Sequence, residues 1–239
     1  MKRVIACAVS VLLLSGSGLH AQNAAEIIKA AGVKGGLVVH VGCGNGELTE
    51  SLRVSDSYLV HGLDTDHKNV EAARKYIRAK GRYGEVSVAA FDGEHLPYAD
   101  NLVNLIVVSS AFRVPQSEIE RVLAPLGVAY VNGKNTVKPW PAEIDEWTHY
   151  LHAPDNNAVA ADSRVAPPKQ LRWTASPAWT RPHDFMSGFN AAVSSQGRLF
   201  YVNDDGPKHS VLLPARWTVS ARDAFNGKLL WKRALPSWH

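Results

Sequence analysis

The segment Leu37-Val38-Val39-His40-Val41-Gly42-Cys43-Gly44-Asn45-Gly46 carries the strongest fold signal in the chain. Its first half is almost entirely apolar and rich in valine, which predicts a buried strand. Three glycines follow at alternate positions, and the pattern from Gly46 to Arg53 predicts a helix. Glycine allows a sharp turn and a close approach of the backbone to a ligand, and a helix start offers unpaired N–H groups. The stretch therefore predicts a ligand-binding loop between a strand and a helix.

The residues around this loop predict an α/β fold. From Asn23 to about Asn132, apolar strand-like runs alternate with helical patterns, as in βαβ units on a parallel sheet. The further predicted strands are Tyr58–Leu63, Val86–Ala90, Val103–Ser109 and Val128–Val131. The predicted helices are Ala24–Ala31 (with Asn23 as N-cap and Gly32 as C-cap), Gly46–Arg53, Lys68–Ala79 and Ser117–Leu123.

Two carboxylates follow strands of this pattern. Asp64 ends the next predicted strand, about 20 residues after Gly42, where a carboxylate can accept hydrogen bonds from both hydroxyls of a ribose. Asp92 ends the third predicted strand, within reach of an adenine edge. The sequence therefore predicts a nucleoside-binding site.

Together these motifs resemble the class I S-adenosylmethionine-dependent methyltransferases. The resemblance covers roughly residues 24–132, and its motifs occur in the usual order: Val41–Gly46 with Leu48-Thr49, Gly62-Leu63-Asp64, Phe91–Tyr98 and Glu120–Pro125. The G-x-G-x-G spacing also disfavours a nicotinamide dinucleotide, whose fingerprint is G-x-G-x-x-G.

The resemblance implies a short Rossmann-like methyltransferase sheet, S-adenosylmethionine as cofactor, and transfer of its methyl group to an acceptor that stays unknown. It places Gly42, Gly44 and Gly46 at the methionine part of the cofactor, Asp64 at the ribose, and Asp92 with Gly93 at the adenine.

The chain departs from the family pattern at several positions. His40 stands where the family usually has an acidic residue near the cofactor's ammonium group, and neutral histidine could accept one hydrogen bond there. Asn104 replaces a common aspartate, and Pro125-Leu126-Gly127 replaces the usual Pro-Gly-Gly. The pattern stops after five strands, so we expect the closing antiparallel hairpin to be missing or replaced. A methyltransferase fold with a decayed site is the alternative interpretation.

The catalytic residues are left unassigned. We find no pair of side chains that would activate a nucleophile, and positioning alone can supply most of the rate of methyl transfer. His95 and Tyr98, after the third predicted strand, could contact the substrate, but isolated residues of these types are more typical of ordinary surface groups.

The second part of the chain is expected to be all-β. Prolines and tryptophans accumulate from about Lys138, and two hairpins follow, one turning at Ser195-Gln196-Gly197 and one at Asn226-Gly227. Asp223–Trp231 resembles the repeat of quinoprotein (pyrroloquinoline quinone type) β-propellers, in which a tryptophan packs between adjacent blades. This repeat appears once, whereas a propeller needs at least four blades, so we expect a partial β-propeller that continues in a longer protein or in another chain.

This second resemblance leaves two alternative functions open. One is an exported scaffold or binding protein that contacts envelope partners through the propeller. The other is a quinoprotein oxidoreductase with a vestigial methyltransferase-like domain, although the residues present do not support binding of pyrroloquinoline quinone.

The lead-in to the all-β part contains scattered potential metal ligands: His149, His152, Asp155, His183 and Asp184. Their spacing does not match a standard zinc site and no thiolate is near, so we predict no metal and a docked linker instead.

The N-terminus predicts export. Lys2 and Arg3 precede an apolar run, Val4–Leu14, and a small-residue segment ending at Ala21, as in a secretory signal peptide cleaved after Ala21. The run is too short to span a membrane, so we expect a periplasmic or secreted protein without a membrane span after cleavage. Cys43 is then the single cysteine of the mature chain, so no intrachain disulfide can form.

The composition indicates the class of protein but does not identify a partner. The 239 residues are 46% hydrophobic and 20% charged, which indicates a globular protein. The 26 Lys and Arg are scattered rather than gathered in a basic stripe, which argues against nucleic-acid binding. We predict four segments: a signal peptide (1–21), a methyltransferase-like domain (22–135), a Pro/Trp-rich lead-in (136–190) and the start of a propeller (191–239).

Overall fold

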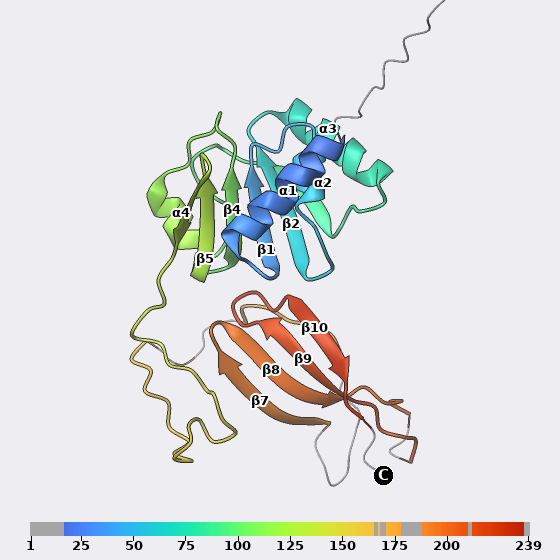
Figure 1. Ribbon diagram of the computed structural model, residues 1–239, viewed down its shortest axis with the longest axis vertical. Helices are drawn as coiled ribbons and strands as arrows, with labels where there is room; N and C mark the ends of the chain where they lie inside the picture. The colour runs from blue at the N-terminus through green and yellow to red at the C-terminus, as the bar shows by residue number, and fades with distance from the viewer. Residues whose placement is uncertain (1–16, 165–166, 168–170, 178–187, 210–211, 237–239) are drawn as a thin grey trace, which may run out of the picture.

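The computed structural model contains two β-sheets (Figure 1). Helices alternate with the strands of the first sheet and are absent between the described strands of the second. It describes residues 17–164, 167, 171–177, 188–209 and 212–236. Residues 1–16, which hold most of the predicted signal peptide, lie outside the described residues. In the part of the chain that is described, none of the helices has the length and apolar character that a membrane span requires.

The first sheet has six strands in the order β3-β2-β1-β4-β5-β6. Its elements along the chain are α1 (Ser17–Ala31), β1 (Gly36–Val41), α2 (Glu47–Ser51), β2 (Tyr58–Asp64), α3 (His67–Ala79), β3 (Val86–Ala90), β4 (Val103–Val108), α4 (Gln116–Val122), β5 (Leu123–Val131) and β6 (Lys134–Val137). The first five strands are parallel, and β1 lies in the middle with every residue buried. This confirms the predicted Rossmann-like sheet, in which the central strand is buried along its whole length because other elements cover both faces.

Each face of the sheet carries its own core. One face packs against α1, α2 and α3, and its buried residues include Ile27, Leu52 and Ile77. The other face packs against α4 and the loops that follow β3 and β4, with Leu96 and Ile119 among its buried residues. From β1 the chain first adds β2 and β3 on one side and then returns to add β4 and β5 on the other, so the strand order reverses at β1.

Local signals explain most of the helix limits. Asp66 caps α3 by accepting the Lys68 N–H at 2.8 Å, and Val70, Ala73 and Ile77 form its buried stripe. Gly81, at φ +69°, follows its end.

The predicted N-cap at Asn23 is wrong, because α1 begins at Ser17 and Asn23 lies inside it. No proline interrupts the residues before Asn23, and leucine, alanine and glutamine among them are good helix formers. The predicted C-cap is confirmed, since Gly32 has a φ of +69° and its N–H donates to the Ile28 carbonyl.

The sheet closes with one antiparallel strand. β6 pairs with β5 through a turn at Asn132-Gly133, where both residues have positive φ, as in the tightest hairpin turns. The closing hairpin was expected to be missing or replaced, and in the described residues the single strand β6 stands in its place.

The second sheet is an antiparallel meander in the order β10-β9-β8-β7. Its strands are β7 (Phe189–Ser195), β8 (Arg198–Asp204), β9 (Trp217–Asp223) and β10 (Leu229–Ala234). Both predicted hairpin turns are confirmed, at Gln196-Gly197 and at Asn226-Gly227. Figure 1 shows this sheet lying against the edge of the first sheet at which the parallel strands begin.

Polar side chains join the two sheets. Asn104 of β4 accepts the Leu37 N–H at 2.8 Å and donates to Asp223 of β9 at 2.6 Å. Asn226, in the β9–β10 turn, donates to the Asn104 side chain at 2.7 Å and to the Leu102 carbonyl at 2.9 Å. The departure from the family pattern at Asn104 therefore serves the contact between the two parts of this chain.

The lead-in is docked, as predicted. Trp173 lies over Gly227, where a Cβ would come within 2.4 Å of its ring, and its indole N–H donates to the Ala224 carbonyl at 3.0 Å. His152 is 2.7 Å from the Asp145 carboxylate, and His149 is 2.9 Å from the Thr148 hydroxyl. Among the described residues no three His, Cys, Asp or Glu side chains gather as metal ligands. The other two candidate ligands, His183 and Asp184, lie outside the described residues.

Candidate functional site

The glycine-rich loop lies at the edge of the first sheet where the parallel strands end. It follows β1 directly, and Gly46 is the N-cap of the short helix α2. The loop is tied to β2, because the Gly42 N–H and the Cys43 N–H both donate to the Leu63 carbonyl. In open α/β sheets, ligands bind beyond the carboxyl ends of the strands, at the point where the strand order reverses. The loop occupies that point.

The three predicted glycines have positive φ values, but their surroundings differ. A Cβ at Gly42 would come within 2.6 Å of the Phe112 ring, and one at Gly46 would come within 2.8 Å of Ala73 in α3. A Cβ at Gly44 would meet nothing within 4 Å. Two of the glycines therefore make room for the protein's own side chains, and Gly44 is the one that faces open space.

Asp64 lies beside Gly44. Its Oδ2 accepts the Gly44 N–H at 3.0 Å, and its Oδ1 accepts the Asp66 N–H at 3.0 Å and the Asn69 amide at 3.2 Å. The side chain is buried at 1% exposure. A carboxylate has about four acceptor positions, so three protein donors leave room for one more hydrogen bond. A ribose could reach Asp64 only if the groups that cover it move.

His40 has a different surrounding from the one predicted. The ring is 2% exposed, with Nδ1 at 2.8 Å from the Thr49 hydroxyl and Nε2 at 3.1 Å from the Ser109 hydroxyl. Ser109 donates its proton to the Gly42 carbonyl, so it accepts from Nε2–H, and Nδ1 accepts from Thr49. Burial lowers the pKa of His40 to about 4. His40 is thus a neutral part of the support beneath the loop, and neither of its nitrogens is left to meet an ammonium group.

Cys43 has no reactive character here. Burial raises the pKa of its thiol to about 12, so the thiolate does not form near neutral pH.

Asp92 and Gly93 lie in the loop that follows β3. Gly93 has a φ of +90°. A Cβ added at this position would lie 3.2 Å from the methyl group of Thr65, the residue that follows Asp64. Asp92 turns its carboxylate back onto its own loop, where Oδ1 accepts the N–H groups of Glu94 and His95. The predicted contact of Asp92 with adenine stays a prediction.

The loop after β3 holds an acid–base pair that the sequence analysis did not find. Asp92 Oδ2 is 2.9 Å from His95 Nδ1. The backbone and side-chain hydrogen bonds to its oxygens lower the pKa of Asp92 to about 2, and the bond to Asp92 raises the pKa of His95. The spacing Asp-x-x-His in a loop is the signal that could have pointed to this pair. Tyr98, by contrast, is no surface group, since its hydroxyl is 2.6 Å from His61 Nδ1 and burial raises its pKa.

The fold and the loop together define a class of protein. A parallel sheet that reverses at β1, with a G-x-G-x-G loop beyond that strand and an aspartate at the end of β2, is the arrangement that the resemblance to class I methyltransferases implies. The family described as "Methyltransferase domain" matches residues 38–127. Residues 38–127 are thus similar to a methyltransferase domain, and the chain joins this part to a four-stranded antiparallel sheet.

Characterised relatives match the same part of the chain. The demethylmenaquinone methyltransferase of Lactobacillus johnsonii is 37% identical over 93 residues, which are 36% of this chain and 38% of that protein. Methyltransferase GfsG of Streptomyces halstedii is 33% identical over 96 residues, which are 38% of this chain and 34% of that protein. The chain thus spans little more than a third of the length of these relatives.

A solved structure is also similar. It is the crystal structure of an S-adenosyl-L-methionine-dependent methyltransferase, described as putative, from Methanococcus maripaludis. It is 26% identical with a TM-score of 0.45, over 48% of this chain and 55% of that one.

Proposed function

We propose that this chain transfers a methyl group from S-adenosylmethionine to an acceptor that is not yet known. The observation that carries the proposal is the open backbone at Gly44 beside the Asp64 carboxylate, at the carboxyl edge of the sheet and inside the matched segment. Gly42, Gly44 and Gly46 would hold the methionine part, Asp64 the ribose, and Asp92 with Gly93 the adenine. When bound, the sulfonium supplies an activated methyl group, so the protein has mainly to position the acceptor.

Binding of S-adenosylhomocysteine tests this proposal. The melting temperature of the purified protein is measured with and without this ligand. At 100 times its dissociation constant the ligand should add about 2.7 kcal/mol of stability. A folded protein without any shift would favour the decayed-site interpretation.

Asp64→Ala separates binding from folding. The Gly44 N–H and the Asn69 amide lose their acceptor in this variant, which should cost about 1–3 kcal/mol, and the ligand shift should vanish. Asp66→Ala is the matched control, because it removes a neighbouring carboxylate that only caps α3. It should cost about 1 kcal/mol and keep the ligand shift. Loss of stability in both variants with an unchanged shift in both would contradict the assignment of Asp64.

A second candidate is a scaffold in which β7–β10 begin a β-propeller. A four-stranded antiparallel meander is the unit of a propeller blade. Trp231, the predicted inter-blade tryptophan, lies on the outer strand β10 at 38% exposure, with its ring 6.1 Å from that of Phe200. Reading the gene past His239 tests this candidate. Further repeats that end in tryptophan would favour a propeller, with or without quinone chemistry, and an immediate stop codon would exclude it for this chain.

Export is part of the proposal. Cleavage after Ala21 would keep Ala24, Ile27 and Ile28, the α1 residues that are buried against the first sheet. The mass of the protein recovered from the periplasm or the medium tests it, since an N-terminus at Gln22 is expected. A full-length chain that stays in the cytosol would exclude a cleaved signal.

A further inference from the structure

Two side chains of α4 hold the loop that follows β3, residues 91–98. Arg121 donates from Nη1 to the Tyr98 carbonyl at 2.7 Å and from Nη2 to the Leu96 carbonyl at 2.9 Å. Glu118 Oε2 accepts the Leu96 N–H at 2.9 Å. The backbone at the end of the loop is therefore bound through its donors and its acceptors by one short helix.

Arg121 and Glu118 also hold each other. Arg121 Nε is 2.7 Å from Glu118 Oε1, and Arg121 Nη2 is 2.8 Å from Glu118 Oε2, so the pair is bidentate. The bonds from Arg121 lower the pKa of Glu118 to about 2, so the carboxylate stays charged at neutral pH. Arg121 Nη1 further donates to Asp100 at 2.9 Å. All five N–H groups of the guanidinium are thus in use, and the group cannot turn without breaking several bonds.

The other end of the loop is tied to the residue proposed for the ribose. The Phe91 N–H donates to the Asp64 carbonyl at 3.1 Å. Asp92 and Gly93, the residues proposed for the adenine, come directly after Phe91. They therefore lie between two fixed points, one at the end of β2 and one on α4.

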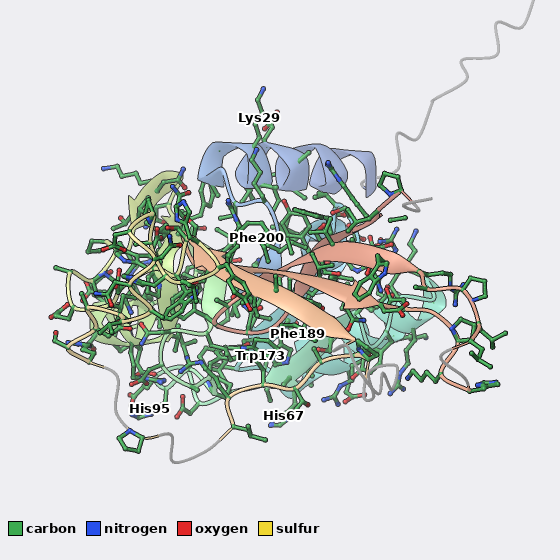
Figure 2. The ribbon with its side chains drawn as sticks, turned by 90° about the horizontal axis from the view of Figure 1, so that it is seen from below. Lys29, His67, His95, Trp173, Phe189 and Phe200 are labelled. Carbon is green, nitrogen blue, oxygen red and sulfur yellow. The ribbon has the colours of Figure 1, made fainter. Side chains whose placement is uncertain are left out.

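The middle of the loop is exposed. The side chains of Asp92 and His95 are 55% and 74% exposed. Figure 2 places His95 on the side of the molecule opposite Lys29 of α1. An exposed segment has few packing contacts that could fix its position, so its position depends on its two ends.

We propose that Arg121 and Glu118 are positioning residues for the adenine of S-adenosylmethionine. They hold the end of the loop whose middle carries Asp92 and Gly93, and in this proposal neither of them touches the ligand. The inference rests on the proposed function. A loop that is already in place loses less conformational entropy when the ligand binds, so release of the loop should weaken the contacts to adenine in particular.

Arg121→Lys tests the inference, because lysine keeps the positive charge but has three donors and no planar fork. Isothermal titration calorimetry, at a temperature where each variant is folded, measures dissociation constants for two ligands. S-Adenosylhomocysteine is the first, and S-ribosylhomocysteine, which keeps the ribose and homocysteine but has no adenine, is the second. The variant should bind S-adenosylhomocysteine at least about tenfold more weakly, roughly the affinity of one hydrogen bond. Its affinity for S-ribosylhomocysteine should not change.

Arg74→Lys is the matched control. Arg74 lies on α3 and pairs at 2.6 Å with Glu71, three residues before it, and its side chain is 33% exposed, as is that of Arg121. It donates to the Val88 carbonyl of β3 and not to the loop. This variant should bind both ligands as the wild type does.

Hydrogen exchange of the unliganded protein gives a second measurement. In Arg121→Lys the amides of Leu96 and Tyr98 should exchange faster, while the amides of β1 keep their protection. Unchanged exchange at these two amides would overturn the inference. Equal weakening of both ligands would overturn it too, since a general loss of structure does not distinguish the adenine.

Binding of S-adenosylhomocysteine by the wild type separates the two proposals. A wild-type protein that does not bind this ligand overturns the proposed function, and the role of Arg121 and Glu118 with it. A wild-type protein that binds the ligand, together with an Arg121→Lys variant that binds it equally tightly, overturns the positioning role alone.

Discussion

At the scale of single residues, His40 shows how burial changes the role that a position has in a family pattern. An acidic residue there would lie near the cofactor, and the sequence predicts histidine as a weaker acceptor for the same group. Instead the ring joins Thr49 of α2 to Ser109 after β4, and through Ser109 it supports the Gly42 carbonyl. The side chain serves the geometry of the loop rather than a ligand.

The buried ring predicts a loss of stability in acid. Unfolded His40 binds a proton as the pH falls below 6.5, whereas the folded ring resists protonation until about pH 4. The unfolded state therefore takes up more protons across this window, and stability falls with pH by roughly 3 kcal/mol in total. Urea unfolding between neutral pH and pH 4 measures this loss.

His40→Gln provides the comparison, because glutamine can still donate and accept hydrogen bonds but does not titrate. The variant should lose about 3 kcal/mol less than the wild type over the same pH range. If the free energy of unfolding falls with pH equally in both proteins, His40 is not the group responsible. The loss then comes from groups that the two proteins share, such as the carboxylates.

At the scale of elements, the glycine-rich loop contains three glycines for three different reasons. The sequence pattern assigns them one role, but Gly42 accommodates Phe112 and Gly46 accommodates α3. These contacts come from segments far away in the chain, so the spacing of the motif carries no sign of them. Gly44 alone combines a positive φ with open space.

Gly44→Val tests that distinction. Valine at a φ of +52° is strained, which should lower stability by about 1–2 kcal/mol, and its side chain fills the space above the loop. We expect the thermal shift with S-adenosylhomocysteine to disappear. Gly81→Val is the control, because Gly81 also has a positive φ, +69°, and open surroundings, after α3 and away from the loop. It should show a similar loss of stability with a normal ligand shift, and a lost shift in both would point to strain alone.

At the scale of the whole molecule, the contact between the two sheets depends on Asn104. Its side chain bonds to Leu37 of its own sheet and to Asp223 and Asn226 of the second part. Gly36 makes this possible, since a Cβ there would come within 1.9 Å of the Asn104 side chain. Asp223 is itself buried, and burial raises its pKa.

Asn104→Ala should therefore weaken the contact between the two sheets and lower the free energy of unfolding of the protein. It leaves the Leu37 N–H and the Asp223 carboxylate each without one partner, which should cost about 2–3 kcal/mol in all. Hydrogen exchange should show β9 and β10 opening before β1 and β4. Asn135→Ala is the control, since that exposed amide donates only to the Ala30 carbonyl. If the two variants lose the same small amount, Asn104 does not join the two parts.

The amino-acid sequence alone predicts the α/β part, the order of its strands and helices along the chain, the loop after β1 and the two hairpins of the second part. These features depend on local signals: apolar periodicity, capping residues, and glycine where φ is positive. The sequence also predicted that Asp64 ends the second strand, and β2 does end there.

Which side chains these residues contact became visible in the folded structure and not in the sequence. The burial of His40 and Asp64, the pairing of Asp92 with His95 and the bridge from Asn104 to Asp223 depend on which side chains meet in three dimensions. Asp92 and His95 are close in sequence, yet the turn that brings them together follows from backbone hydrogen bonds to a single carboxylate oxygen. Contacts of this kind arise from packing between distant segments and from side-chain orientation, which hydrophobic patterns and motif spacing do not encode.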